Sequence, residues 1–284
     1  MAAADAGWSW EEWISSNGVG VDERGDWDTP MSFAPGNPDR IFVAKHRLYW
    51  TDDDGGTWSQ TSAIPGSEME VLALAESDPQ VAIMARTTQA FLTSNLLTWA
   101  AISGLPGLPV TDVLIDPFNA ARFWLSFGGY DADERVWFTA DSGQSWTSVG
   151  DGLPALPINV LELDTASGNL YAGTDAGVYV LPSDGEVWTP YKEGLPAVVC
   201  TELGIRYSTG ELLLSTYGRG LWRAPLYEVP ERDGACMSIL GAAPETCGAI
   251  PRVNLEFRNA GADTLVGATV LWNETDTVNY GFIL

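Results

Sequence analysis

The chain has 284 residues, 18% of them charged, and it carries a formal net charge of −24 with a sequence pI near 4.1. This acidity excludes a general binder of nucleic acid or of anionic membranes, because both need positive charge on the protein. Hydrophobic residues make up 45% of the chain, which is enough for a packed core and excludes wholesale disorder. No apolar run reaches the roughly 18–20 residues needed to span a bilayer.

A tryptophan-ended motif recurs along the chain. Two full copies, at 51–58 and 139–146, have the frame Ser/Thr-x-Asp-x-Gly-x-Ser/Thr-Trp. The copy at 5–10 is cut at its front, the copy at 93–99 lacks its glycine, and the copy at 183–188 is shortened. The Asp can accept hydrogen bonds from its own turn, the Gly permits a positive φ, and the Trp opens a strand. We therefore expect a structural role for Asp5, Asp53, Gly55, Trp58, Asp141, Gly143, Trp146, Asp184 and Trp188.

The spacing of the motif predicts a repeat architecture. The tryptophans that end the five copies lie 48, 41, 47 and 42 residues apart. A period in the forties is typical of one four-stranded blade of a β-propeller. Between the motifs the chain alternates apolar and polar residues in pairs of strands separated by turns rich in Asp, Asn, Pro and Gly. The expected strands include 31–34, 41–43, 71–74, 113–115, 123–125, 160–163, 170–172, 203–207 and 212–214.

The two ends of the repeat region complement each other. Residues 201–226 read as three strands without a following motif, whereas residues 7–14 read as a motif remnant with an outer strand only. We expect residues 7–14 to pair beside 220–225 and complete one blade, because closure removes exposed sheet edges. This predicts five blades. If the N-terminus is truncated, the parent protein could have six to eight blades, which is the usual propeller range.

The motif and its period resemble the Asp-box, or bacterial neuraminidase repeat, of β-propellers. Within that group the chain is more similar to sortilin-like and photosystem-assembly-type repeat proteins than to sialidases. The sialidase Arg-Ile-Pro signature is replaced by Arg40-Ile41-Phe42, and no position matches the paired aspartates of xyloglucanase-like propellers. The resemblance covers about residues 3–228. It implies an all-β propeller over 1–229, with ligands on the face opposite the Asp-boxes.

Residues 230–284 differ from the repeats. Val253-Asn254-Leu255-Glu256-Phe257 alternates, and a strand resumes after a turn at Asn259-Ala260-Gly261. This pattern resembles part of an immunoglobulin-like β-sandwich, a module that follows propellers in secreted bacterial proteins. Cys236 and Cys247 bracket a short loop there and are a predicted disulfide. Cys200 is expected to be a buried free thiol on an inner strand.

The N-terminus lacks the pattern of a signal peptide, so we interpret the chain as a piece of a longer secreted or cell-surface protein. The resemblance implies a ligand face built from the loops between the second and third strands of each blade and from the loops between the fourth strand and the first strand of the next blade. Five of the 14 Lys and Arg residues fall in the loops between second and third strands with the sole histidine, and Tyr217 joins them. These ligand-binding candidates are Lys45, His46, Arg47, Arg86, Arg135, Tyr217 and Arg219. They could form an anion site, or they could be solvated turn charges.

The stretch Arg24-Gly25-Asp26-Trp27-Asp28 enters the first inner strand from the same face, and Arg24 and Trp27 are further ligand candidates. Asp26 and Asp28 are weak candidates for a sugar-hydrolysing carboxylate pair, and a charged turn is the simpler interpretation. The sequence thus favours a monomeric, non-catalytic binding or adhesion propeller for glycan or protein ligands. The alternative is a glycoside hydrolase acting on polysaccharide. No metal and no cofactor is expected.

Overall fold

The computed structural model describes residues 25–131, 134–228, 234–240, 254–259, 267–272 and 276–281. The chain divides into two compact units, Met1–Leu226 and Tyr227–Leu284. All regular elements of the described residues are β-strands. No helix in this part of the chain is long and apolar enough to cross a membrane.

The first unit contains five antiparallel sheets whose strands follow chain order. The first has β1 (Met31–Ala34), β2 (Asn37–Ala44), β3 (Leu48–Thr51) and β4 (Ser59–Gln60). The second has β5 (Val71–Leu74), β6 (Ala82–Arg86), β7 (Gln89–Thr93) and β8 (Ala100–Ala101). The third has β9 (Val110–Ile115), β10 (Phe123–Phe127), β11 (Val136–Thr139) and β12 (Thr147–Ser148). The fourth has β13 (Ile158–Leu163), β14 (Leu170–Thr174), β15 (Gly177–Leu181) and β16 (Thr189–Pro190). The fifth has β17 (Cys200–Arg206), β18 (Glu211–Thr216) and β19 (Gly220–Pro225).

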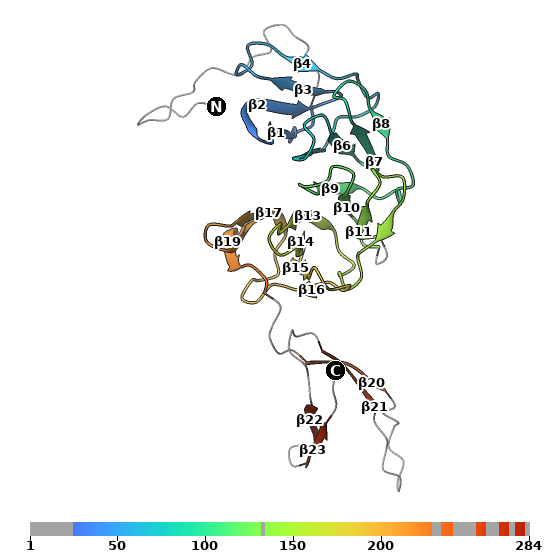
Figure 1. Cartoon of the computed structure of the whole chain (residues 1–284), viewed down its shortest axis with the longest axis vertical. Helices are drawn as coiled ribbons and strands as arrows, with labels where there is room; N and C mark the ends of the chain where they lie inside the picture. Colours follow the sequence, from blue (N-terminus) through green and yellow to red (C-terminus); the bar gives the residue numbers. More distant parts are fainter. Residues whose placement is uncertain are drawn as a thin grey trace, which may run out of the picture. The chain divides into compact units, whose positions relative to one another are not determined.

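The sheets are the blades of a propeller, as the repeat spacing predicted. Successive first strands pack against one another, in the order β1, β5, β9, β13 and β17. In Figure 1 the first strands lie on the inside of the series, and the short fourth strands lie on the outside. The prediction of an all-β propeller with five blades is therefore confirmed. The predicted fourth strand of the last blade, residues 7–14, lies outside the described residues.

The cores lie between neighbouring blades, because each sheet has apolar side chains on both faces. One cluster joins Ile83 and Ala85 of the second blade to Phe123, Leu125 and Phe127 of the third. A second cluster joins the first blade to the second, and a third joins the third blade to the fourth. The strand β10 places Phe123, Leu125 and Phe127 at every other position, which is the alternation that orients side chains to one face of a strand. Cys200 begins β17 as a buried free thiol, as predicted.

The second unit contains two described hairpins. One pairs β20 (Gly234–Leu240) with β21 (Asn254–Asn259), and the other pairs β22 (Gly267–Trp272) with β23 (Asp276–Gly281). Strands are therefore present where the sequence predicted them, but the assignment to an immunoglobulin-like sandwich stays a prediction. Cys236 lies in β20 and Cys247 lies outside the described residues, so their disulfide also stays a prediction.

Candidate functional site

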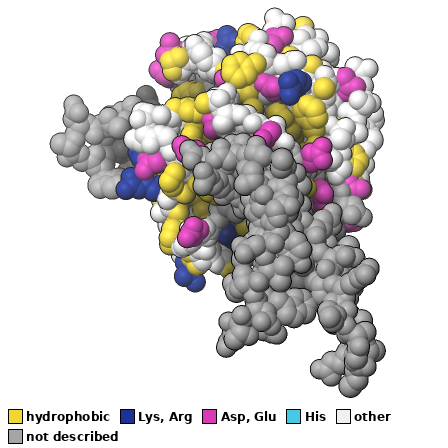
Figure 2. All heavy atoms as spheres, turned by 60° about the horizontal axis from the view of Figure 1, so that its bottom comes forward, with side chains coloured by type: hydrophobic (Ala, Val, Ile, Leu, Met, Phe, Trp, Pro, Cys, Tyr) yellow, Lys and Arg dark blue, Asp and Glu magenta, His cyan; other side chains and the backbone are white. Residues whose placement is uncertain are grey.

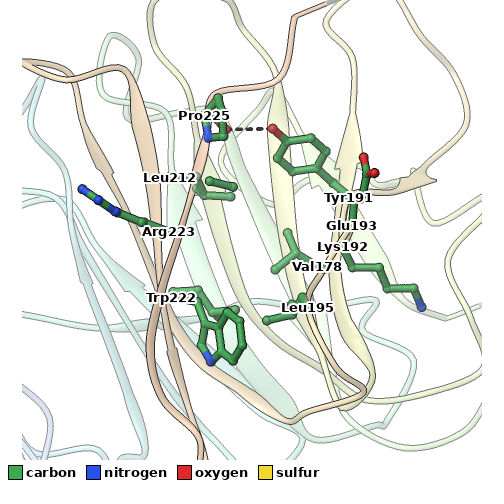
Figure 3. A pocket seen from close by; sticks show the side chains of 12 residues that line it. Val178, Tyr191, Lys192, Glu193, Leu195, Leu212, Trp222, Arg223 and Pro225 are labelled. Atoms are coloured by element: carbon green, nitrogen blue, oxygen red, sulfur yellow. Dashed lines mark hydrogen bonds between the residues drawn. The ribbon is translucent and has the colours of Figure 1, made fainter.

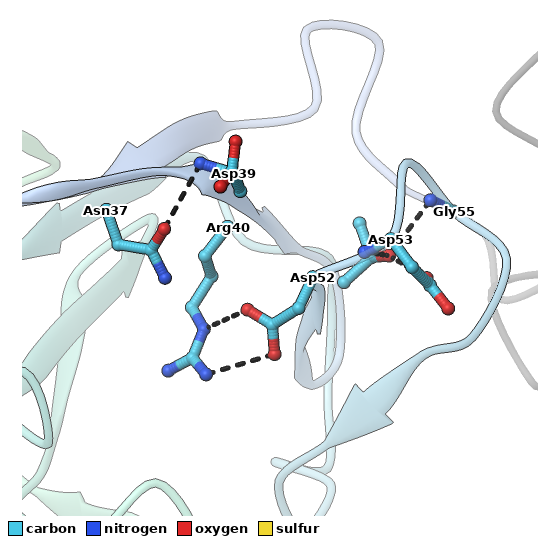
Figure 4. A network of polar contacts seen from close by, with 7 residues as sticks. Asn37, Asp39, Arg40, Asp52, Asp53 and Gly55 are labelled. Atoms are coloured by element: carbon cyan, nitrogen blue, oxygen red, sulfur yellow. Dashed lines mark hydrogen bonds and ion pairs between the residues drawn. The ribbon is translucent and has the colours of Figure 1, made fainter.

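The first motif copy forms a self-contained turn between β3 and β4. The Asp53 carboxylate accepts hydrogen bonds from the backbone N–H of Thr57 at 2.7 Å, from the Thr57 hydroxyl at 2.9 Å and from the Thr51 hydroxyl at 2.8 Å. These donors lower the pKa of Asp53, the Thr57 N–H first among them. Gly55 follows at a φ of 88° and donates its N–H to the Thr51 hydroxyl oxygen. Beside this turn, Asp52 forms a two-pronged ion pair with Arg40 (Figure 4).

The second full copy repeats the same bonds. Asp141 accepts from the Ser145 hydroxyl at 2.6 Å, from the Ser145 N–H at 2.9 Å and from the Thr139 hydroxyl at 2.8 Å. The pKa of Asp141 falls to about 2, chiefly because of the Ser145 hydroxyl. In the damaged copy, Asn95 takes the place of the Asp and accepts from the backbone N–H groups of Leu97 and Thr98. The carboxylates of the two full copies therefore hold their own turns together.

The loops between second and third strands lie at the other end of the blades from these turns. β3 begins after Arg47 and ends at Thr51, so the Lys45-His46-Arg47 turn and the first Asp-box turn are at opposite ends of one strand. In later blades the loop lies beside the segment that enters the first strand of a blade. Thr87 accepts a backbone hydrogen bond from Val110 at 2.7 Å, and Tyr217 donates one to Val199 at 2.9 Å. Equivalent loops of successive blades thus share one face.

Two of the predicted ligand residues on this face are buried. Arg86 is 5% exposed and donates to the carbonyl oxygens of Ser67 at 2.8 Å and Pro65 at 2.6 Å. Gly66, between them, has a φ of 132°, and a Cβ at this position would lie 2.4 Å from Nη2 of Arg86. The segment 65–67 therefore wraps the guanidinium group closely. Arg86 anchors this loop rather than facing solvent.

Arg135 is also buried. Its Nη1 donates to the carbonyl oxygens of Gly129 at 3.1 Å and Leu156 at 3.0 Å, and thereby connects the third blade to the segment entering the fourth. A Cβ on Gly150 would lie 2.8 Å from the Arg135 Cβ, so the packing around this side chain is tight. The predicted convergence of cations on one ligand consequently depends on the Lys45-His46-Arg47 turn and on Arg219.

Exposed aromatic side chains accompany these cations. Tyr130, in the loop between β10 and β11, is 72% exposed, and Tyr217, in the loop between β18 and β19, is 80% exposed. Arg219 is exposed beside Tyr217. Tyrosine offers a large apolar ring with a polar tip, and it is enriched at binding surfaces for that reason. The sequence indicated Tyr217 as a ligand candidate but did not indicate Tyr130.

The weak catalytic candidates lie on an exposed turn. Asp26 and Asp28 flank Trp27, whose side chain is fully exposed, and the Asp26 carbonyl accepts a hydrogen bond from Thr29 at 2.7 Å. Arg24 lies outside the described residues. Asp184 of the shortened motif copy is exposed as well.

The sequence did not single out three carboxylates on first strands. Burial raises the pKa of Asp112 on β9 to about 6, and burial together with the charges of Glu202 and Asp112 raises the pKa of Glu162 on β13 to about 7. Burial raises the pKa of Glu202 on β17 as well, although it is the most exposed of the three. Asp112 accepts backbone hydrogen bonds at 2.8 Å from Val113 and from Leu161 of the next blade. Asp112 therefore links two blades.

The described residues contain no group of three His, Cys, Asp or Glu side chains that could hold a metal ion. The surface is predominantly acidic. Figure 2 shows one face, on which Asp and Glu side chains are spread widely and Lys and Arg side chains occur at a few places.

Comparison with solved structures gives propellers of different functions. One is the family 74 glycoside hydrolase xyloglucanase of Xanthomonas campestris, with a TM-score of 0.55 and 14% identity over 68% of this chain and 36% of the enzyme. Another is the Swd1 propeller domain of Myceliophteria thermophila, with a TM-score of 0.55 and 10% identity over 81% of this chain and 72% of that domain. The third is YCF48 bound to D1 peptide, with a TM-score of 0.50 and 15% identity over 68% of this chain and 63% of YCF48.

These likenesses show the propeller fold alone. The chain spans about a third of the length of the xyloglucanase. No protein-family model and no curated protein matches the sequence. The class is thus a β-propeller, similar in fold both to polysaccharide hydrolases and to a propeller bound to a peptide.

Proposed function

We propose that this chain is a non-catalytic binding or adhesion module of a secreted multidomain bacterial protein. In this proposal the propeller belongs to the Asp-box group, near its sortilin-like and photosystem-assembly-type members. An immunoglobulin-like module follows it, and the protein is a monomer. A glycan or protein ligand binds the face made by the loops between second and third strands.

The exposed pair Tyr130 and Tyr217 carries this proposal. Both rings project from loops on one face, and the cationic Lys45-His46-Arg47 turn and Arg219 belong to loops on the same face. An aromatic ring packs against a sugar ring or an apolar peptide side chain, and a guanidinium group can bind a carboxylate through two parallel hydrogen bonds. On a chain with a net charge of −24, these few cations would favour an acidic ligand over a neutral one.

The test is binding of the full chain to an array of neutral and acidic oligosaccharides and to a displayed peptide library, with a hydrolysis assay in parallel. Tyr217→Ala and Arg219→Ala should each weaken binding to the best ligand at least several-fold. Phe118→Ala is the matched control, because Phe118 is 76% exposed in the loop between β9 and β10, at the other end of the blade. Equal losses in Tyr217→Ala and Phe118→Ala, or unchanged binding in Tyr217→Ala and Tyr130→Ala, would exclude this face.

A polysaccharide hydrolase is the second candidate, and the raised pKa of Glu162 favours it. A carboxyl group with a pKa of about 7 can act as a general acid near neutral pH, and a second carboxylate completes such a site. The test is release of reducing ends from xyloglucan and from acidic polysaccharides. Hydrolysis that disappears in Glu162→Gln, with folding retained, would establish the enzyme and overturn the binding proposal.

A further inference from the structure

A cavity of about 520 Å³ lies between the fourth blade and the exposed edge of the fifth (Figure 3). Its walls come from β15, from the segment after β16, from β18 and from β19. The apolar lining includes Val178, Leu195, Leu212, Leu214 and Trp222. In Figure 3 the side chains of Val178, Leu195, Leu212 and Trp222 point into one space. Tyr191 lies at its rim, and its hydroxyl donates a hydrogen bond to the Pro225 carbonyl at 2.8 Å.

The same position one blade earlier is filled by a tryptophan. Trp188, which ends the fourth motif copy, is 2% exposed within a cluster that includes Val136, Leu153, Leu170, Ala172 and Tyr179. Strand pairing shows that the residues around Trp188 correspond to the residues that line the cavity. Leu170 corresponds to Leu212, because each pairs with the first strand of its blade at the same register: Leu170 pairs with Leu163, and Leu212 pairs with Ile205. Tyr179 pairs with Ala172 and Trp222 pairs with Leu214, so Tyr179 corresponds to Trp222 and Ala172 corresponds to Leu214.

Val136 corresponds to Val178, because their carbonyls accept equivalent bonds from Val149 and Tyr191. Leu153 and Leu195 occupy the same place in two Gly-Leu-Pro segments. The cavity is therefore the tryptophan socket of the fifth blade.

The filled sockets also define a polar contact. The indole N–H of Trp188 donates to the Val149 carbonyl at 2.6 Å, and that of Trp146 donates to the Ser103 carbonyl at 3.2 Å. Each acceptor lies just after the fourth strand of the preceding blade. Since Tyr191 is the equivalent of Val149, its carbonyl is the expected acceptor in the socket of the fifth blade.

We propose that residues 5–13 of this same chain occupy the open edge of the fifth blade, with Trp10 in the cavity and Glu11-Glu12 as the fourth strand beside β19. The motif copy at 5–10 is the one copy of the five without described inner strands, and its Trp10 follows the same Ser/Thr-Trp frame as Trp58 and Trp146. The fifth blade is the one that has three described strands. The proposal holds whatever ligand the propeller binds.

The register follows from the complete blades. The residue after the motif tryptophan pairs with the third strand, as Ser59 pairs with Trp50 and Thr189 pairs with Val180. In the fourth blade, Tyr171 of β14 pairs with Val180 of β15. In the fifth blade, Leu213 of β18 occupies the place of Tyr171 and pairs with Arg223 of β19, so Arg223 is the equivalent of Val180. Glu11 is then opposite Arg223, and Glu12 is opposite Trp222. An opposite-charge pair across two strands favours this register.

A second observation, on the first blade, points to the same segment. The indole N–H of Trp58 is buried, its side chain is 9% exposed, and it has no hydrogen-bond partner among the described residues. Trp99, Trp146 and Trp188 all donate this N–H to the blade before their own. Val149 lies three residues after Trp146, and residue 13 lies three residues after Trp10. In this proposal the carbonyl of residue 13 is therefore the acceptor for the indole N–H of Trp58. Residues 5–13 would thus fill the cavity beside β19 and also supply the acceptor that the Trp58 indole N–H lacks among the described residues.

Proximity tests the register in the full chain. Glu11→Cys combined with Arg223→Cys, in a background with Cys236→Ser and Cys247→Ser, should react with dibromobimane to give a fluorescent cross-link within one chain. The matched control is Glu11→Cys with Arg219→Cys, because residue 219 is four positions along the chain, about 13 Å away at 3.3 Å per residue. Peptide mass spectrometry identifies the linked residues. Cross-links that form only between two chains, equal cross-linking in both pairs, or no cross-link at all would overturn the proposal.

Stability tests the socket independently. Trp10→Ala should lower the melting temperature clearly, whereas Trp8→Ala should change it little. Trp8 occupies the motif position of Gly56 and Gln144, which are both exposed. If Trp10→Ala melts at the wild-type temperature, or if Trp8→Ala is equally destabilised, Trp10 is not the occupant of the cavity.

Discussion

At the scale of single residues, the aspartates of the turn motif differ in what they hold. Asp141 gathers two backbone N–H groups and two hydroxyls into one turn. Asp184, at the corresponding place in the shortened copy, makes no side-chain hydrogen bond within the described part of the chain, and that turn instead closes through a backbone bond from Gly185 to Pro182. The aspartate carboxylate therefore closes the turn in one copy, whereas a backbone hydrogen bond closes it in the other.

We expect Asp141→Ala to destabilise the propeller, because it removes the acceptor of several hydrogen bonds. Asp184→Ala is the matched control and should leave the melting temperature nearly unchanged. The comparison is made by thermal unfolding at pH 7. Similar melting temperatures for both variants would contradict the role assigned to Asp141.

Residue-scale electrostatics also predicts a pH dependence. The pKa of Glu162 rises from an ordinary 4.5 to about 7 in the folded chain, so between these values the folded state binds more protons than the unfolded state. Stability contributed by this group is complete below pH 4.5 and is lost as the pH rises toward 7. Asp112, with a pKa of about 6, acts in the same direction.

We therefore expect the free energy of unfolding from urea titrations to decrease between pH 4.5 and 7. In Glu162→Gln, which cannot ionise, this decrease should be smaller. Below pH 4 the trend reverses, because the lowered pKa of Asp141 means that its stabilising contribution is lost as the pH falls toward 2. An equally steep decrease in wild type and Glu162→Gln would show that Glu162 does not carry the effect.

At the scale of the elements, each short fourth strand is only two residues long and is held by the tryptophan that precedes it. Trp188 fills the space between the third and fourth blades and bonds to Val149 of the earlier one. The tryptophan thus links two sheets that have no shared strand. Trp99 makes the same kind of link through its bond to Thr61 at 2.9 Å.

Trp188→Ala should lower the free energy of unfolding by about 3–5 kcal/mol, the usual cost of removing a large buried aromatic side chain. Trp27→Ala is the control with the same chemical change at a fully exposed position, and it should stay within about 0.5 kcal/mol of wild type. Chemical denaturation of the two variants measures both. A loss below about 1 kcal/mol in Trp188→Ala would mean that the inter-blade tryptophan contributes little.

At the scale of the whole molecule, net charge is the dominant electrostatic feature. The chain has 38 Asp and Glu residues but only 14 Lys and Arg residues. Like charges on a compact folded protein repel one another, and this repulsion favours the unfolded chain. Salt weakens the repulsion between charges that lie farther apart than the Debye length, which is about 10 Å at 0.1 M ionic strength. Surface ion pairs such as that of Arg40 with Asp52 are individually weak.

The melting temperature should therefore rise when the NaCl concentration increases from about 10 mM to about 500 mM, because the Debye length shortens severalfold over that range. KCl at equal ionic strength is the control and should have the same effect, since screening does not depend on the cation. A fall in melting temperature with salt would show that attractive ion pairs outweigh the net repulsion.

The sequence by itself determined the repeat, the strand pairs and the turns of this propeller. The bonds of Asp53 and Asp141 join residues at most four positions apart, and local interactions of this kind are readable in a linear pattern. The alternation of apolar residues likewise fixed most strands within a few residues of their ends. Part of the candidate site, the cationic turn and Tyr217, was predictable because it lies in the loops between those strands.

Only the tertiary structure decided which charged residues are accessible. Arg86 was predicted as a ligand residue, but residues 65–67 enclose it from about twenty positions away. Glu162 reads as an ordinary polar position of a strand, yet neighbouring blades bring Asp112 and Glu202 near enough to raise its pKa. The cavity beside β19 also depends on two blades at once. These contacts join residues of different blades or connecting segments that are distant in the chain, and the alternation of apolar residues within one strand does not specify them.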